Sequence, residues 1–179
     1  MDPNEAKLLV EKCVPRFKAA GLPDIKVDSI TEVRAHAVAQ MWGGFGRIYE
    51  LSISTDVGLV ASIIAKRVQL PETCNSLGDQ RKKDSYDVEA NFYSEGHAER
   101  LIRAGCIVPF PLHVEASREE GLTICMSKLQ KRRSSLEEAK CCKAFVLWLA
   151  RLHATYWCSR ADEACKEGPG DGLQQQGCY

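Results

Sequence analysis

The sequence predicts an α+β fold, in which an antiparallel sheet of about five strands is accompanied by amphipathic helices. Residues 32–40 and 49–54 alternate between apolar and polar side chains, as a strand with one buried face does. Residues 59–68 are almost continuously apolar, which is typical of a central strand covered on both faces. Residues 134–157 repeat apolar side chains at the helical period, which predicts one long amphipathic helix.

Composition and charge argue against several classes of protein. The 179 residues include 24 basic and 24 acidic side chains, so the zero formal charge predicts no nucleic-acid partner. The longest apolar stretches, 59–65 and 144–149, are shorter than the roughly 20 residues that cross a bilayer. The first residues lack the pattern of a secretory signal. We therefore expect a cytoplasmic protein that has no membrane partner.

The nine cysteines are scattered along the chain and form no Cys-x-x-Cys pair. In a reducing compartment such residues are either small apolar core residues or exposed thiols. The ligand spacing of a tetrahedral zinc site is absent from the sequence. We expect reduced cysteines, no disulfide scaffold and no metal site.

The first 22 residues are predicted to form a helix. Asp2 can cap its N-terminus, Pro3 suits the first helical position, and Glu5 places an acid in the first turn. Pro15 is expected to kink this helix or end its first part. Gly21 is expected to close it. Because its apolar residues share one face, we expect this helix to contribute packing and not chemistry.

A glycine-rich turn follows the first predicted strand. Gly43, Gly44 and Gly46 surround Phe45, and residues 49–54 then continue as a second strand. Glycines let the backbone approach a ligand closely because no Cβ intervenes, and an aromatic residue at the tip can close over that ligand. The alternative is an ordinary hairpin with a flexible tip.

Lys66 ends the apolar run of the third predicted strand. Counting with period two places it on the same face as Val60, Ser62, Ile64 and Val68. A lysine in such surroundings either extends its ammonium to solvent or meets an anion. The neighbouring glycine turn favours the anion.

Glu89 is the acidic residue that we expect to pair with Lys66. Residues 69–83 are predicted to be a polar connection, and a helix is predicted from residue 84 or 85 to about residue 105. Glu89 borders the inward face of that helix, so an ion pair with Lys66 is geometrically reasonable. The alternatives are that Glu89 is an exposed helix charge, or that Glu95 or Glu99 takes its place.

Two more strands complete the predicted sheet. Residues 106–114 contain prolines and are therefore expected at an edge, while residues 122–126 alternate cleanly. Met126, Ser127 and Lys128 lead out of the last strand, where backbone groups could bind the edge of a base. Two overlapping Ser-x-x-Glu capping boxes begin the long helix at 134–157. Residues 158–179 have the composition of a disordered tail.

These motifs, in this order, resemble the small-molecule branch of the protein-kinase-like fold, which contains choline, aminoglycoside and ecdysteroid kinase-like phosphotransferases. The matching segments lie within residues 30–157: Gly43-Gly44-Phe45-Gly46, Ala65-Lys66, Glu89-x-x-Phe92-Tyr93, Met126-x-x-Leu129, and Trp-Leu-Ala-Arg-Leu-His-Ala-Thr-Tyr-Trp at 148–157. The resemblance implies a nucleotide-facing small lobe at 30–129 and the first helix of an incomplete large lobe at 134–157.

The resemblance also implies roles for residues. The glycine turn would cover the phosphates of ATP, Lys66 would bind them, Glu89 would hold Lys66 in place, and 126–129 would contact the base. The implied cofactor is ATP with Mg²⁺, and the implied substrate is a small alcohol.

The chain departs from this family's pattern after His153. None of the 26 residues that follow forms the His-Gly-Asp-x-x-x-x-Asn segment or the later metal-binding aspartate that the resemblance implies. We therefore assign no catalytic and no metal-binding residue. Because phosphoryl transfer needs those carboxylates, we expect little or no activity from these residues alone, and an acceptor only if a large lobe is supplied.

Two other interpretations remain open. In the first, the protein is a non-catalytic kinase-like scaffold that binds a partner protein through the apolar stripe of the long helix, a surface that could also mediate self-association. In the second, it is an unrelated α+β domain in which Lys66 and Glu89 are structural.

Overall fold

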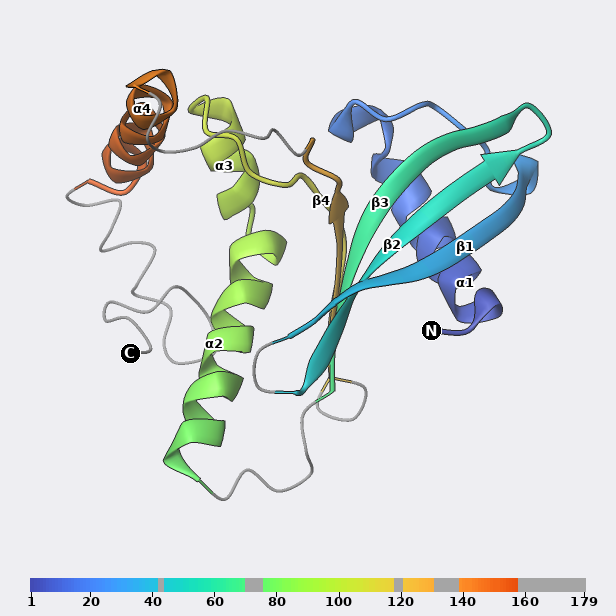
Figure 1. Ribbon diagram of the computed structural model, residues 1–179, viewed down its shortest axis with the longest axis horizontal. Coiled ribbons are helices and arrows are strands. Elements are labelled where there is room, and N and C mark those ends of the chain that lie inside the picture. The colour runs from blue at the N-terminus through green and yellow to red at the C-terminus, as the bar shows by residue number, and fades with distance from the viewer. Residues whose placement is uncertain (42–43, 70–75, 118–120, 131–138, 158–179) are drawn as a thin grey trace. The chain divides into compact units, whose positions relative to one another are not determined.

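Five antiparallel strands form one sheet in the computed structural model (Figure 1). The order is β1-β2-β3-β5-β4, so β3 is central. The strands are β1 (Ile30–Gln40), β2 (Gly46–Thr55), β3 (Gly58–Val68), β4 (Pro111–Ser117) and β5 (Gly121–Ser127). The α-helices are α1 (Pro3–Cys13), α2 (Leu77–Ser94), α3 (His97–Arg103) and α4 (Ala139–Thr155). The structure describes residues 1–41, 44–69, 76–117, 121–130 and 139–157. The predicted α+β class and the sheet of about five strands are confirmed.

The chain divides into two compact units. The first comprises Met1–Gln80 and Phe110–Lys128, and it contains α1 and the whole sheet. The second comprises Arg81–Pro109 and Leu129–Tyr179, and its described part contains most of α2 together with α3 and α4.

Helix α1 begins as its sequence predicts. The carboxylate of Asp2 accepts hydrogen bonds from the backbone N–H groups of Asn4 and Glu5, at 2.9 and 3.1 Å. The α-helix ends at Cys13, and two 3₁₀ turns, Val14–Arg16 and Lys18–Ala20, continue the segment. The first of these turns contains Pro15, which has no N–H to extend the α-helical ladder. Gly21 then ends the segment with a left-handed backbone at a φ of 70°.

The core of the first unit lies between α1 and one face of the sheet. Phe17, Leu51, Ile53 and Ile63 are at most 1% exposed and pack with the apolar side of α1. On β3 the residues of this face alternate, since Ala61, Ile63 and Ala65 are buried and the residues between them are half-buried. The sequence predicted a strand covered on both faces, and this part of β3 has one fully buried row of side chains and one half-buried row.

The predicted boundaries of the helix that carries Glu89 were wrong at both ends. α2 begins at Leu77 because Ser76 caps it: the Ser76 hydroxyl accepts from the Asp79 N–H at 3.0 Å and donates to the Asp79 carboxylate at 2.7 Å. α2 ends at Ser94, and Gly96, with a φ of 79°, separates it from α3. The predicted single helix is therefore two helices.

The strand predicted at 106–114 begins only at Pro111. It lies at the edge of the sheet, as its prolines predicted. Phe110, just before the strand, exchanges hydrogen bonds with Ser127, which fixes the entry of the chain into β4.

Side chains of α4 contact the loop that follows α3 in the second unit. An Nη of Arg151 donates to the carbonyl of Gly105 at 2.7 Å, and Nε1 of Trp148 donates to the carbonyl of Ile107 at 3.1 Å. The Tyr156 hydroxyl, just beyond α4, lies 2.9 Å from Nδ1 of the buried His97. Both capping boxes and the tail 158–179 lie outside the described residues. No helix in the described part of the chain has the length and apolarity to span a membrane.

Candidate functional site

Lys66 lies on the central strand of the sheet. It pairs with Ile48 on β2 and Ile124 on β5, so its side chain shares a face with theirs. Its neighbour Arg67 forms an ion pair with Glu5 of α1, which identifies the opposite face as the one that α1 covers. Lys66 is therefore on the face away from α1. Ser62 and Ile64 share this face, as predicted.

The glycine turn is held by its own backbone hydrogen bonds. The Gly44 N–H donates to the carbonyl of Met41 at 3.1 Å, and the Met41 N–H donates to the carbonyl of Gly46 at 2.9 Å. The Gln69 N–H, just after β3, donates to the carbonyl of Phe45 at 2.7 Å. The N–H of Gly44 is thus occupied within the turn and would have to leave Met41 to bind a phosphate. Gly43 lies outside the described residues.

Gly46 has a structural reason to be glycine. A Cβ at this position would overlap the backbone carbonyl oxygen of Arg67 and would also press on the sulfur of Met41. Gly46 pairs with Val68, so the close approach belongs to the contact between β2 and β3. Gly44 differs, because its φ of 79° is left-handed while the space around it is open.

The residues predicted to contact a base differ in their hydrogen bonds and in where their side chains lie. The Ser127 N–H donates to the carbonyl of Phe110 at 2.9 Å, and the Ser127 hydroxyl accepts from the Phe110 N–H at 2.8 Å. The backbone N–H of Ser127 is therefore already used and is not available to a base. Met126 pairs with Ile64, which puts its side chain on the same face as Lys66. Lys128 directs its ammonium to Glu50.

Glu50 is a site residue that sequence analysis did not single out. It pairs with Ile64 and lies diagonally across β2 and β3 from Lys66, on the same face. Its Oε1 accepts from Nζ of Lys128 at 2.5 Å and from the hydroxyl of Ser62 at 2.7 Å. The Lys128 hydrogen bond, followed by that of Ser62, holds the pKa of Glu50 below its ordinary value. The alternation of 49–54 puts Glu50 on the polar side of its strand, and the hairpin turn brings that side across to β3.

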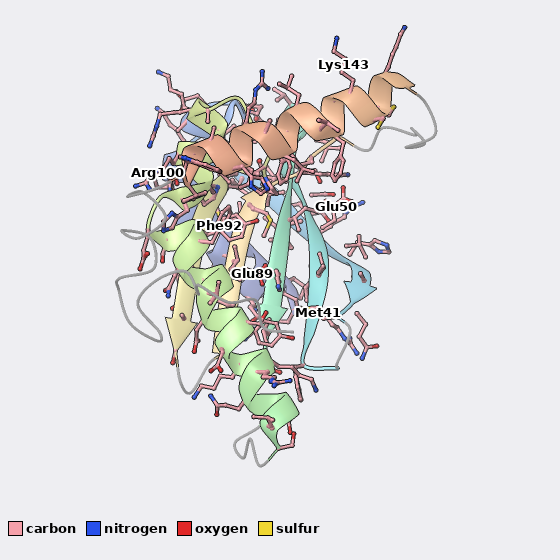
Figure 2. The ribbon with its side chains drawn as sticks, turned by 90° about the vertical axis from the view of Figure 1, so that its left-hand side faces the viewer. Met41, Glu50, Glu89, Phe92, Arg100 and Lys143 are labelled. Atoms are coloured by element: carbon pink, nitrogen blue, oxygen red, sulfur yellow. The ribbon has the colours of Figure 1, made fainter. Side chains whose placement is uncertain are left out.

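Glu89 lies on α2 (labelled in Figure 2), in the second unit. Lys66 lies on β3, in the first unit. The Lys66–Glu89 ion pair therefore stays a prediction. Within its own unit, Glu89 acts on a neighbouring tyrosine: burial, with the charge of Glu89 adding to it, raises the pKa of Tyr93 to about 12. Tyr93 is protonated at neutral pH and can donate a hydrogen bond.

We expect the pKa of Glu50 to rise toward its ordinary value when Lys128 is replaced by methionine. The ammonium stabilises the charged carboxylate, so its removal takes away the largest cause of the lowered pKa. Because that pKa is lowered, the pair stabilises the fold above the ordinary pKa of a glutamate, and this stabilisation is lost as the pH falls through the lowered value. A carboxyl ¹³C NMR titration of Glu50 checks the shift. Lys26→Met is the control, and an identical Glu50 titration in both variants would contradict the assignment.

Comparison of the chain with models of known families, with curated proteins and with solved structures finds no match. Among the described residues, no group of three or more histidines, cysteines or acids could hold a metal ion. No residue of the described chain is therefore assigned to Mg²⁺.

Proposed function

We propose that this chain is the nucleotide-facing part of an ATP-dependent phosphotransferase acting on a small alcohol, of the choline, aminoglycoside and ecdysteroid kinase-like group. The observation that carries the proposal is the position of Lys66. It lies on the central strand, on the face away from α1, two residues before Val68, which pairs with Gly46 at the end of the glycine turn. A lysine beside such a turn can neutralise phosphate oxygens while the turn limits access of water.

The neighbouring charges fit a role for Lys66 as the phosphate-binding cation. Glu50 is the acid diagonal to Lys66, and Lys128 and Ser62 already hydrogen-bond to its carboxylate. Glu50 is thus partly neutralised, which weakens its competition with phosphate for the Lys66 ammonium. Met126 shares this face, but its side chain is only 8% exposed and offers a base little apolar surface.

Transfer to an alcohol is not part of the proposal for these 179 residues alone. A carboxylate that accepts the proton of the substrate hydroxyl and carboxylates that hold the metal are needed for that step. The segment after His153 contains neither motif. We expect nucleotide binding by this chain, and alcohol phosphorylation only when a large lobe supplies those groups.

Replacing Lys66 with alanine is expected to weaken Mg·ATP binding by roughly 10–100-fold, the range for a lost charge-assisted hydrogen bond. Isothermal titration calorimetry of the wild-type chain and of the variant measures this change. Lys26→Ala, an exposed lysine outside the sheet, is the matched control and should bind as the wild type does. Equal affinity in the two variants, or no binding by the wild type, would overturn the proposal. Sustained ADP formation by the wild-type chain would contradict its expected lack of turnover.

One observation favours a second candidate function, that of a scaffold which binds a partner protein. Phe145, Val146 and Leu147 on α4 are between 47% and 57% exposed, and α4 includes Lys140, Lys143 and Arg151 but no acidic residue (Figure 2 labels Lys143). The occupant that fits is an amphipathic segment with acidic flanks, because its charges would complement those of α4.

A pair of synthetic amphipathic helices distinguishes this candidate. A peptide with glutamate flanks should bind the chain at least about 10-fold more tightly than the same peptide with lysine flanks, if the basic side chains of α4 contribute. Equal binding of the two peptides would reject the scaffold. Concentration-dependent dimerisation in sedimentation experiments, with no preference between the peptides, would identify a second copy of the chain as the occupant instead.

A further inference from the structure

A polar pocket of about 470 Å³ lies beside the glycine turn, on the face of the sheet opposite to Lys66. Its position follows from strand alternation: Arg67 is next to Lys66 on β3 and contacts Glu5 of α1, and Arg47 on β2 pairs directly with Arg67. The side chains that line the pocket and can form hydrogen bonds are those of Gln40, Arg47, Tyr49, Arg67 and Gln69. All of them belong to the first unit.

Two guanidinium groups face each other across β2 and β3 in this pocket. Residues paired directly in an antiparallel ladder have Cβ atoms about 5 Å apart, and like charges at such positions destabilise the sheet. Glu5 compensates one of the two charges through its ion pair with Arg67. Arg47 is exposed and has no ion pair within the described part of the chain. Among the described residues, one of the two positive charges in the pocket therefore has no compensating carboxylate.

The guanidinium of Arg67 is also incompletely hydrogen-bonded. Its Nε is buried and has no acceptor among the described residues, although another nitrogen of the same group contacts Glu5. A buried N–H without an acceptor is costly, and such groups are uncommon in folded proteins. An oxyanion in the pocket that Arg67 lines would supply both an acceptor and the missing negative charge.

We propose that this pocket binds a small organic phosphate. Arg47 and Arg67 would contact the phosphate oxygens, because guanidinium groups match oxyanions with two parallel N–H donors. The amides of Gln40 and Gln69 and the hydroxyl of Tyr49 offer further hydrogen bonds to the rest of the ligand. The volume lies within the range of small-molecule sites, so the pocket has room for a ligand larger than inorganic phosphate. This site is separate from the Lys66 face and does not depend on the function proposed above.

The test is made in a Lys66→Ala background, which removes the cation proposed to bind phosphate on the other face. Inorganic pyrophosphate is titrated into this variant by calorimetry, at low salt so that charge interactions are not screened. Adding Arg47→Gln is expected to weaken binding at least about 10-fold. Adding Arg34→Gln, an arginine whose side chain is 77% exposed on β1, is the matched control and should change the affinity less than about twofold.

Glu5→Gln provides a second test, in which the affinity for pyrophosphate is expected to rise instead of fall. Removing this carboxylate frees Arg67 from its ion pair, so pyrophosphate should bind several-fold more tightly than in the Lys66→Ala parent. A residue with only a structural role would not produce tighter binding. No pyrophosphate binding by the parent, equal loss in the two arginine variants, or weaker binding after Glu5→Gln would each overturn the proposal.

Mg·ATP titrated into two single variants, Lys66→Ala and Arg47→Gln in the wild-type background, separates this site from the proposed nucleotide surface. If Lys66→Ala abolishes ATP binding while Arg47→Gln retains it, the two sites are distinct and both proposals stand. If Arg47→Gln abolishes ATP binding and Lys66→Ala does not, the arginine pocket binds the phosphates of the nucleotide. In that case the pocket is supported and the function proposed for Lys66 fails.

Discussion

Replacing Ile63 with alanine is expected to lower the free energy of unfolding of the first unit by about 2–5 kcal/mol. Ile63 is fully buried on the central strand and packs within the cluster that joins α1 to the sheet. Truncation removes apolar contacts and leaves a cavity that a five-stranded sheet cannot readily close, because β3 is hydrogen-bonded on both sides. Urea denaturation followed by far-UV circular dichroism measures the loss as a lower midpoint at an unchanged slope.

Leu59→Ala is the matched control for Ile63→Ala. Leu59 lies on the same strand, but it is 69% exposed, so its truncation should cost less than about 0.5 kcal/mol. If the two variants lost the same stability, Ile63 would not be at the centre of the core. The burial pattern of β3 would then be incorrect.

Replacing Gly121 with alanine is expected to destabilise the first unit by about 3 kcal/mol. Gly121 has a φ of 80°, a conformation that costs an alanine about 1–2 kcal/mol. In addition, its Cβ would overlap the carbonyl oxygen of Val68, so β5 would have to move away from β3 at a further cost of about 1–3 kcal/mol. Urea denaturation measures the total. Amide hydrogen exchange should show the largest loss of protection in the β3–β5 ladder.

Gly58→Ala separates the two parts of this effect. Gly58 also has a positive φ, of 102°, but a Cβ there would meet nothing within 4 Å. Its substitution should therefore cost only the conformational part, about 1–2 kcal/mol. Equal losses for the two glycines would show that the close approach of Val68 to Gly121 adds nothing.

Local patterns predicted those features of the fold that depend on neighbouring residues. Alternation predicted β1, β2 and β5, and a continuous apolar run predicted β3. Asp2, Pro3 and Glu5 predicted the start of α1, because a cap acts within one helical turn. The start of α2 was missed for a local reason. Ser76 and Asp79 form its cap, but the surrounding polar residues and Gly78 also fit a loop.

The candidate site was predictable only in part, for a different reason. The glycine turn and Lys66 were predicted because each is a feature of one short segment. The contact between Glu50 and Lys128 was not predicted, since the two are 78 positions apart in sequence and meet only because β2, β3 and β5 lie side by side. Nothing in the local sequence specifies which strand β3 takes as its second neighbour.

Lys66 and Arg67 show both kinds of feature side by side. That their side chains point to opposite faces of the sheet follows from their adjacent positions, because successive residues of any strand alternate. Which face is covered could be seen only from the folded chain: α1 packs over one side, Glu5 pairs with Arg67 there, and Lys66 lies on the other side with Glu50. Alternation is a property of one strand, whereas covering a face requires a helix distant in sequence to bury its apolar side against it.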